Sequence, residues 1–376
     1  MERRVLMSAT VPSMIGQFNI NNIKLLQEMG YIVDVAGDFT DTSVWPIERV
    51  EKLKQQLHEM GVECIQIDFS RSPFSIKRHI KAYKDSMSLL EKRNYAFVHT
   101  HTPIASAIIR LVAHKTNTKV IYTAHGFHFY KGAPLKNWAI FYPLEKYLSK
   151  YTHTLITINK EDFAIAEKRF KAKNIVYVPG IGVDVAKFQS AEESSESIRQ
   201  ELGISDETML FVSVGELSHR KNHSVIIKAL SQVNKDFYYI IVGQGELEQE
   251  LKNMISSLGL NDRVSLLGYR TDISQILHAA DVFLFPSLQE GLPVALMEAM
   301  ACGLPCIVSE IRGNTDLVDS TVGELIHNNT VAEWNESINT LNMESLSEKR
   351  KAVLARIEQF DKSVVEKLMR NIYSNI

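Results

Sequence analysis

The feature that most limits how this chain can fold is a regular alternation of short apolar runs with segments of helical periodicity. Between Ile20 and Met29, for example, apolar residues recur at three- and four-residue spacing, and Gly30 closes the helix. Short apolar strands that alternate with helices are typical of parallel sheets covered on both faces. The strands are expected at residues 5–9, 31–36, 64–67, 96–99, 119–123, 155–158, 175–178, 210–214, 239–242, 264–266, 282–285, 306–309 and 324–326.

The chain is too long for one such sheet. Its 376 residues exceed what a single core usually supports, and the strand pattern occurs twice. The breakers Pro179, Gly180 and Gly182 precede a polar stretch, Gln189–Ser197, that is typical of a linker. We therefore predict an α/β chain of two facing doubly wound domains with a deep cleft between them, at residues 1–185 and 186–359. An amphipathic last helix at about 360–376 is expected to pack back on the first domain.

Charge and cysteine content limit the partners and the compartment. Residues 1–190 contain 26 Lys and Arg against 17 Asp and Glu, whereas residues 191–376 contain 16 against 27. A basic half suits phosphate or an anionic surface, but no nucleic-acid-binding signature accompanies it. Three cysteines are too few for a disulfide framework. No apolar run could span a bilayer, and the first run is expected to be a strand and not a signal peptide. These features predict a cytoplasmic protein.

The most informative segment follows the strand predicted at 282–285. Glu290 and Gly291 precede Pro293, which suits a first helical turn, and Glu298 lies on an otherwise apolar helix. A helix N-terminus favours an anion such as a diphosphate, and a buried Glu298 needs a polar partner such as a ribose diol. The alternative is that Glu290 interacts with the helix dipole and Glu298 faces solvent.

A basic loop follows the strand predicted at 210–214. Gly215 and Glu216 precede His219, Arg220 and Lys221. Cations near the start of a helix oppose its dipole, but they suit a phosphate bound between them. A solvated loop is the alternative. Gly243-Gln244-Gly245 lacks the third glycine of a dinucleotide fingerprint, so a strand-to-helix turn explains it and a Rossmann dehydrogenase is disfavoured.

Histidines follow two strands of the first half. His99 and His101 end one strand, and His125 and His128 follow another. Their spacing lacks a nearby carboxylate to complete a metal site, so a hydrogen bond to substrate is favoured over zinc. No two aspartates stand two residues apart, so the Asp-x-Asp metal clamp used with nucleotide sugars is absent. We expect no metal.

Basic and aromatic residues alternate in two segments of the first half. One runs from Arg71 to Lys84 and the other from Lys131 to Lys150, with Trp138, Phe141 and Tyr142 between the lysines. Such a surface could rest on anionic lipid. The alternative is an amphipathic helix whose aromatic side chains face the core.

Together these segments resemble the family-4 retaining glycosyltransferases of GT-B type, and among them the bacterial exopolysaccharide and capsule enzymes. The resemblance covers almost the whole chain. Its motifs are Glu290-x7-Glu298, Val214-Gly215 with Arg220-Lys221, Leu267-Gly268-Tyr269, Gly313-Asn314, His101-Thr102-Pro103, and Thr123 to Phe129 followed by Lys131 to Trp138. Glu216 departs from the pattern, because many relatives carry Arg there, and only Arg220 and Lys221 remain as cations of this loop.

The resemblance implies roles for these positions. The donor would be a UDP-sugar, and the acceptor a lipid-linked saccharide of the polyprenyl diphosphate type at the inner face of the cell membrane. The catalytic residues would be His125, beside the reacting sugar, with Glu290, Arg220 and Lys221. The donor-binding residues would be Gly16, Gly215, Arg220, Lys221, Tyr269, Arg270, Glu290, Gly291, Leu292, Pro293 and Glu298. The acceptor-binding residues would be His101, His128 and Lys131.

The resemblance thus implies a retaining, metal-independent hexosyl or N-acetylhexosaminyl transferase of exopolysaccharide or capsule biosynthesis. Two rivals stay open. A nucleotide-sugar epimerase can be built on the same pair of sheets, but it needs no acceptor. A non-catalytic assembly protein could also retain the fold, although Glu290, Glu298, Arg220 and Lys221 argue against it.

Overall fold

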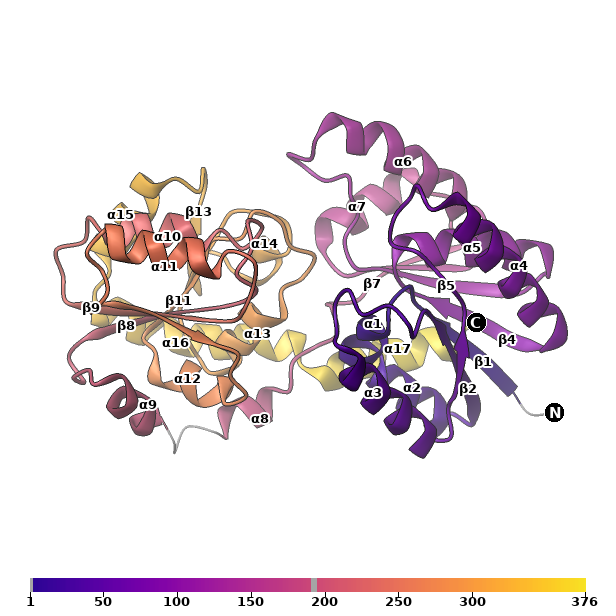
Figure 1. Cartoon of the computed structure of the whole chain (residues 1–376), viewed down its shortest axis with the longest axis horizontal. Coiled ribbons are helices and arrows are strands. Elements are labelled where there is room, and N and C mark those ends of the chain that lie inside the picture. Colours follow the sequence, from indigo (N-terminus) through magenta and orange to yellow (C-terminus); the bar gives the residue numbers. More distant parts are fainter. Residues whose placement is uncertain (1–2, 191–194) are drawn as a thin grey trace. The chain divides into compact units, whose positions relative to one another are not determined.

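The computed structural model describes residues 3–190 and 195–376, which form two compact units (Figure 1). Residues 1–181 and 365–376 belong to the first unit, and residues 182–364 belong to the second. Of the linker predicted at Gln189–Ser197, residues 191–194 lie outside the described residues.

The first unit is built on a seven-stranded parallel sheet of order β3-β2-β1-β4-β5-β6-β7. The strand order reverses between β1 and β4, where ligands of open parallel sheets bind beyond the carboxyl ends. The strands are β1 (Arg3–Ser8), β2 (Tyr31–Gly37), β3 (Glu63–Gln66), β4 (Tyr95–Thr100), β5 (Lys119–Ala124), β6 (Thr154–Thr157) and β7 (Asn174–Tyr177).

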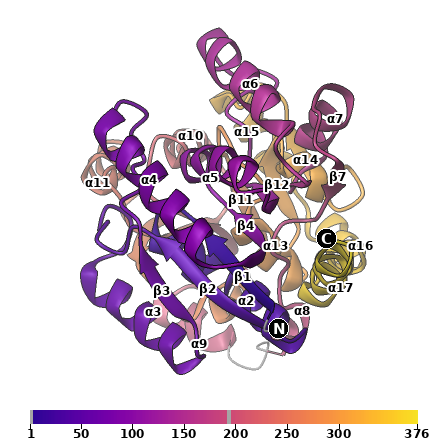
Figure 2. The same ribbon diagram turned by 90° about the vertical axis from the view of Figure 1, so that its right-hand side faces the viewer.

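Helices cover both faces of this sheet because successive residues of each strand point to opposite sides. Val5 and Met7 of β1 pack with α1 (Pro12–Phe18), α2 (Ile20–Glu28), α3 (Ile47–Glu59) and α17 (Lys362–Ser374), whereas Leu6 packs with α4 (Ile76–Lys92) and α5 (Pro103–Lys115). Figure 2 shows β1 and β2 between α4 and α5 on one side and α2 and α3 on the other. The aromatic residues of α6 (Leu135–Ser149) pack with β5, β6 and the side of α7 (Lys160–Arg169).

The last helix of the chain completes the core of the first unit. Its buried residues Val365, Met369, Ile372 and Tyr373 lie in the same apolar cluster as Val5 of β1. The side chain of Tyr373 is 1% exposed and its ring stacks on Phe97 of β4. The first unit is therefore formed from two segments that lie far apart in the sequence.

The second unit is built on a six-stranded parallel sheet of order β10-β9-β8-β11-β12-β13, and its order reverses between β8 and β11. The strands are β8 (Met209–Val214), β9 (Phe237–Val242), β10 (Val264–Gly268), β11 (Val282–Phe285), β12 (Cys306–Ser309) and β13 (Gly323–Ile326). The helices are α8 (Val185–Gln189), α9 (Ser195–Leu202), α10 (His223–Leu230), α11 (Glu248–Ser257), α12 (Ile273–Ala279), α13 (Val294–Ala301), α14 (Asn314–Leu317), α15 (Val331–Thr340), α16 (Met343–Ile357) and the 3-10 helix η2 (Glu358–Phe360).

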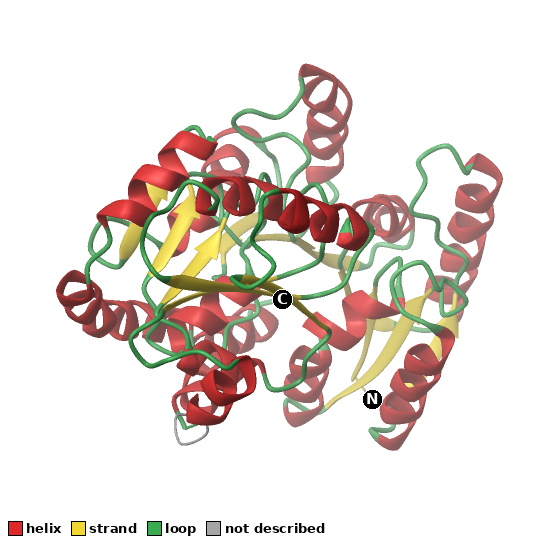
Figure 3. Ribbon diagram, turned by 60° about the vertical axis from the view of Figure 1, so that its left-hand side comes forward, coloured by secondary structure: helices red, strands yellow, loops and turns green. Residues whose placement is uncertain are grey.

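The predicted fold class is confirmed. Each of the thirteen expected strands overlaps an observed strand, with ends that agree within two residues, and Figure 3 shows helices on both sides of each sheet. The two Rossmann-like units with all-parallel sheets are those of the GT-B type. Across residues 3–190 and 195–376, none of the helices has the length and apolar content that a bilayer crossing requires.

Candidate active site

Two loops of the second unit meet at the point where its strand order reverses. One loop follows β8 and carries Gly215 to Asn222, and the other follows β11 and carries Pro286 to Pro293. The backbone N–H of Leu288 donates to the carbonyl of Arg220 at 2.8 Å, which joins the two loops directly. The sheet topology therefore places both predicted donor motifs at one ligand-binding edge.

A buried ion cluster joins these two motifs. Oε1 of Glu290 accepts hydrogen bonds from Nζ of Lys221 at 2.8 Å and from Nη1 of Arg220 at 3.0 Å. Glu290 and Lys221 are each 9% exposed, and the Lys221 ammonium lies 4.5 Å from the centre of the Phe285 ring. Burial lowers the pKa of Lys221 although the charge of Glu290 acts in the opposite direction. One carboxylate thus faces two cations, and the cluster retains a net positive charge that suits an anionic ligand.

The cations of the cluster differ in exposure. The Arg220 side chain is 44% exposed, so its guanidinium can reach a ligand directly. Glu216, at the position where the chain departs from the family pattern, lies 3.9 Å from Nη2 of Arg220 and is itself exposed. An exposed pair at this distance contributes little, so Glu216 leaves most of the charge of Arg220 available.

Close contacts between glycines hold the loops around this cluster. A Cβ atom on Gly243 would lie 1.9 Å from the carbonyl oxygen of Gly215, and one on Gly313 would lie 2.4 Å from that of Gly291. A Cβ atom on Gly215 would lie 3.1 Å from Cε of Lys221. The glycine after β9 therefore serves loop packing, as expected for a strand-to-helix turn, and Gly215 makes room for the stem of Lys221.

Glu298 lies in a different environment from Glu290. It is half-buried on α13, and its carboxylate has no hydrogen bond or ion pair among the described residues. Burial raises its pKa to about 7, with only a weak opposing effect from Lys187. The helix begins at Val294, with Pro293 as its N-cap residue. Glu298 is thus a carboxyl group held half-buried without a protein partner, as a ligand-binding group would be.

Two further residues after β10 were predicted to bind the donor. The Tyr269 side chain is 66% exposed. The Arg270 guanidinium is engaged by Asp272, at 2.6 and 2.8 Å, and by Glu201, at 2.7 and 3.1 Å. Because its side chain is held in these ion pairs, only its backbone remains to contact a base.

Arg312 was missed by the sequence analysis. Its Nε donates to the carbonyl of Glu290 at 3.1 Å, and its side chain is 6% exposed. It therefore anchors the backbone of the residue whose carboxylate holds Lys221. Its position in the sequence could have indicated this residue, because it follows the strand Cys306–Ser309 and directly precedes the family motif Gly313-Asn314.

In the first unit, the predicted histidines gather at the carboxyl ends of β4 and β5. Nδ1 of His101 lies 3.1 Å from Nε2 of His125, and the rings of His99 and His101 are 4.2 Å apart. His101 is 1% exposed, so its side chain contacts His125 rather than solvent, and any contribution to acceptor binding would be indirect. His125 is partly exposed, and burial lowers its pKa to about 4, which keeps the ring neutral at pH 7.

The other predicted acceptor residues lie on the loop before α6. His128 is exposed and its ring stacks on Phe141, with centroids 4.5 Å apart. The backbone N–H of Lys131 donates to Oε1 of Glu161 at 2.6 Å, while its side chain is exposed. These residues are separate from the histidine cluster. Within the described ranges, no group of three His, Cys, Asp or Glu side chains could hold a metal ion.

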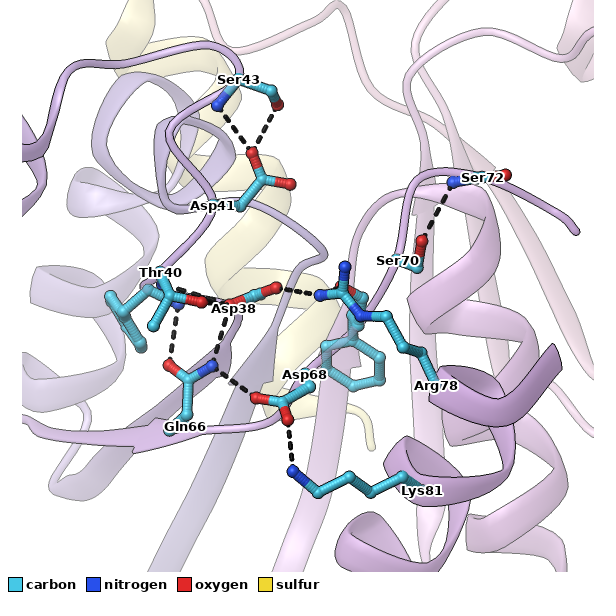
Figure 4. Close-up of polar contacts among 12 residues, drawn as sticks. Asp38, Thr40, Asp41, Ser43, Gln66, Asp68, Ser70, Ser72, Arg78 and Lys81 are labelled. Carbon is cyan, nitrogen blue, oxygen red and sulfur yellow. Dashed lines mark hydrogen bonds and ion pairs between the residues drawn. The ribbon is translucent and has the colours of Figure 1, made fainter. Parts of the chain in front are cut away.

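A polar network fixes the loop that follows β2 (Figure 4). The carboxylate of Asp38, 1% exposed, accepts from the backbone and hydroxyl of Thr40 at 3.1 and 2.6 Å and from Gln66 at 2.8 Å. Arg78 pairs with Asp38, and Lys81 pairs with Asp68. Two cations of the segment Arg71 to Lys84 are therefore engaged by acidic residues of the same unit.

Trp45, on the loop that this polar network fixes, explains why position 16 is a glycine. Gly16 lies inside α1, and a Cβ atom there would lie 2.4 Å from Cη2 of the Trp45 indole. The absence of a side chain at this position is required by an aromatic ring of the protein itself. The approach to donor or acceptor that the resemblance implied for Gly16 stays a prediction.

Gly16→Ala is expected to destabilise the protein by about 1–3 kcal/mol, because the new methyl group overpacks the contact with Trp45. Urea unfolding would measure the change. The Trp45→Phe background removes the outer indole ring and should make the same substitution milder. Unchanged stability together with weakened donor binding would instead support a ligand-binding role for Gly16.

Known proteins resemble this chain over most of its length. Residues 194–357 match the family model described as glycosyl transferases group 1, and residues 21–159 match the model described as glycosyl transferase 4-like. A Bacillus subtilis protein named as glycosyltransferase EpsD is 31% identical over 335 residues, which cover 87% of this chain and 84% of that protein.

Two further comparisons are with a relative whose name gives its substrates and with a solved structure. An Escherichia coli protein named UDP-Gal:alpha-D-GlcNAc-diphosphoundecaprenol alpha-1,3-galactosyltransferase is 37% identical over 257 residues, covering 64% of this chain and 66% of that protein. The crystal structure of Anabaena HepE in complex with UDP and glucose superposes with a TM-score of 0.79 at 19% identity, and all of both chains is covered. At this identity the superposition shows the fold.

Proposed function

The chain belongs to the glycosyltransferases, and on that premise we propose that it transfers a hexose or N-acetylhexosamine from a UDP-sugar to a lipid-linked saccharide. The Escherichia coli relative, whose name contains both UDP-Gal and a diphosphoundecaprenol acceptor, supports these substrate classes. An Erwinia amylovora relative named for amylovoran biosynthesis, 37% identical over 158 residues, supports a place in exopolysaccharide or capsule synthesis. The observation that carries the proposal is the ion cluster of Glu290, Lys221 and Arg220 at the reversal point of the second sheet.

The second unit is proposed to bind the donor. Lys221 and Arg220 would face the diphosphate, the half-buried Glu298 would accept hydrogen bonds from the ribose hydroxyls, and the backbone near Tyr269 would contact the base. Glu290, with the backbone of Gly291 to Pro293, would hold the sugar. Preorganised cations stabilise the charge that develops on a leaving diphosphate, because they are already in place and need not reorganise as the charge forms.

The first unit is proposed to present the acceptor, with His125 beside the reacting sugar. As the sugar–phosphate bond breaks, positive charge develops on the sugar and negative charge on the leaving diphosphate. Retention of configuration would follow if the acceptor hydroxyl attacks from the face that the diphosphate leaves, and its proton passes to a phosphate oxygen. This route needs no protein nucleophile.

One assay tests the proposal and separates it from the epimerase alternative. Purified protein is incubated with a panel of UDP-, GDP- and ADP-sugars, with and without a polyprenyl diphosphate-linked GlcNAc acceptor. Glycosylated lipid that forms only with a UDP-sugar is the expected result. A new UDP-sugar epimer in the absence of acceptor would support the isomerase, and no turnover or donor binding would support a non-catalytic protein.

Turnover is expected to survive a chelator, because Lys221 and Arg220 would supply the charge that a metal provides in other transferases. The measurement compares initial rates before and after extensive dialysis against EDTA. Complete loss of activity that manganese restores would contradict metal-independent transfer.

We further propose that α6 contacts the inner face of the membrane through an apolar–basic surface, which we define as Leu135, Ile140, Leu144, Tyr147, Lys136, Lys146 and Lys150. The four apolar side chains are between 47% and 86% exposed, although Trp138, Phe141 and Tyr142 of the same helix pack toward the core. Exposed apolar residues mixed with lysines suit an anionic lipid interface. The exposed face supports the membrane interpretation of this segment, and the aromatic residues of the opposite face pack as its alternative expected.

Leu135→Asp combined with Ile140→Asp is expected to weaken binding to anionic vesicles by about tenfold or more, since two inserted side chains are lost and two charges are added. Co-sedimentation with phosphatidylglycerol vesicles measures this, with phosphatidylcholine vesicles for comparison. Leu258→Asp, at an exposed leucine of the second unit, is the matched control. Equal binding by all three proteins would remove α6 as the contact surface.

A further inference from the structure

The histidine cluster of the first unit consists of His99, His101 and His125, and the proposed mechanism uses His125 alone. The contact between Nδ1 of His101 and Nε2 of His125 is the one hydrogen bond of either ring among the described residues. Nδ1 of His125 has no partner there and is not fully enclosed, and the ring lies against Phe18 with centroids 5.7 Å apart. His125 is therefore held at one nitrogen and open at the other.

The backbone around His101 is fixed on both sides. Its N–H donates to the carbonyl of Ser8 at 2.8 Å. The next residue, Thr102, has φ 61° and ψ 134°, a strained conformation for a β-branched residue. Its hydroxyl accepts from the backbone N–H of Thr10 at 3.0 Å and lies 2.8 Å from the Thr10 hydroxyl. Strain of this kind persists where the surroundings determine the conformation, and it is frequent at active sites.

His99 packs against the ring of His101 and is itself held in place. Its Nδ1 lies 2.9 Å from the Tyr373 hydroxyl and its Nε2 lies 2.8 Å from the Thr123 hydroxyl, so both ring nitrogens are held. It is fully buried, and its ring packs on that of His101. The position of the His101 ring is therefore set by a residue of β4 that is itself held by side chains of α17 and β5.

The cluster is neutral at physiological pH. Burial lowers the pKa of His99 to about 3 and that of His125 to about 4, and burial together with its two histidine neighbours lowers the pKa of His101 well below the usual value. A neutral imidazole carries one proton, so one ring of the pair donates and the other accepts. The bond between the rings therefore determines whether the open Nδ1 of His125 is a donor or an acceptor.

We propose that His101 is a positioning residue for His125. By holding Nε2 of His125, it directs Nδ1 of that ring toward the substrate, and the two rings can change tautomer only together. The catalytic consequence rests on the function proposed above, whereas the contact between the rings and the orientation of His125 do not.

Two amide substitutions separate positioning from packing. In His101→Asn, the amide lies close to the place of Nδ1 and can still bond to His125, whereas in His101→Gln it lies closer to the place of Nε2. We expect His101→Gln to lower kcat by about 10–100-fold with KM for the donor nearly unchanged, as when the group that orients a catalytic ligand is lost. His101→Asn should retain most of kcat. Equal losses of kcat in both variants would overturn the proposal.

A readout without substrate tests the contact itself. In wild-type protein with ¹⁵N-labelled histidine, we expect a through-hydrogen-bond ¹⁵N–¹⁵N coupling between Nδ1 of His101 and Nε2 of His125. By its ¹⁵N shift, Nε2 of His125 should stay hydrogen-bonded in His101→Asn and lose this bond in His101→Gln. Absence of the coupling in the wild type would overturn the proposal even if neither variant folds. A wild type without transferase activity would contradict the proposed function and leave this measurement intact.

Discussion

Lys221→Ala is expected to lower turnover by a factor of about 10²–10³, which corresponds to about 3–4 kcal/mol of lost transition-state stabilisation. The ammonium is buried beside Glu290 and over the Phe285 ring, so water cannot easily replace it when charge develops on the leaving diphosphate. Because the charge forms as the bond breaks, kcat should fall more than KM for the donor changes.

The matched control is Lys252→Ala, in the same unit, whose half-exposed ammonium pairs with Glu248. It should leave kcat unchanged. Thermal unfolding of Lys221→Ala must accompany the kinetics, because the substitution also leaves the buried Glu290 with Arg220 as its remaining cation. A folded Lys221→Ala protein with nearly normal turnover would contradict the assigned role.

The two glutamates of the Glu-x7-Glu element are expected to affect stability with opposite signs. Glu298→Gln should stabilise the ligand-free protein at pH 8 by up to about 3 kcal/mol, because it removes a half-buried charge that has no partner. Its folded-state pKa is raised above the unfolded value, so the folded state binds this proton more tightly. The free energy of unfolding of the wild type therefore falls as pH rises from about 4.5 to about 7. Below this pH range, Glu298→Gln should no longer be more stable than the wild type.

Glu290→Gln serves as the comparison. It leaves Lys221 buried without a carboxylate, and breaking a buried ion pair from one side costs about 3–5 kcal/mol. Thermal unfolding at pH 5 and pH 8, with and without UDP, measures both effects. If Glu298 binds the ribose, Glu298→Gln should also weaken UDP binding by about 10–100-fold. A Glu298→Gln protein that melts at or below the wild-type temperature at pH 8 would contradict this account of the carboxyl group.

The fold was predictable because each strand is a local pattern. Runs such as Val282 to Phe285 are apolar throughout, as strands covered on both faces must be, and breakers bound them. The ion cluster was not predictable as a cluster, since Lys221 and Glu290 are 69 residues apart and meet only because β8 and β11 are neighbours. The burial of individual side chains was equally unpredictable from the sequence. The sequence placed His101 near a substrate, whereas the fold sets it beneath His125.

Gly16 shows a different limit. A glycine in a first loop suits either a ligand or a neighbouring side chain, and the sequence carried no sign that Trp45 lies against it. Arg312 was hidden for the same reason, because a single arginine after a strand has many possible partners. Roles of this kind depend on tertiary contacts that the hydrophobic periodicity of the sequence does not indicate.

The placement of α17 has a consequence for synthesis on the ribosome. Strands β1 to β7 emerge first, but the apolar surface that Val365, Met369, Ile372 and Tyr373 cover stays open until those residues leave the exit tunnel. The second unit ends at residue 364, so all of its residues are made before those four. The order of translation and the order of folding therefore differ, and the N-terminal unit acquires its final structure only after the C-terminal unit has been made.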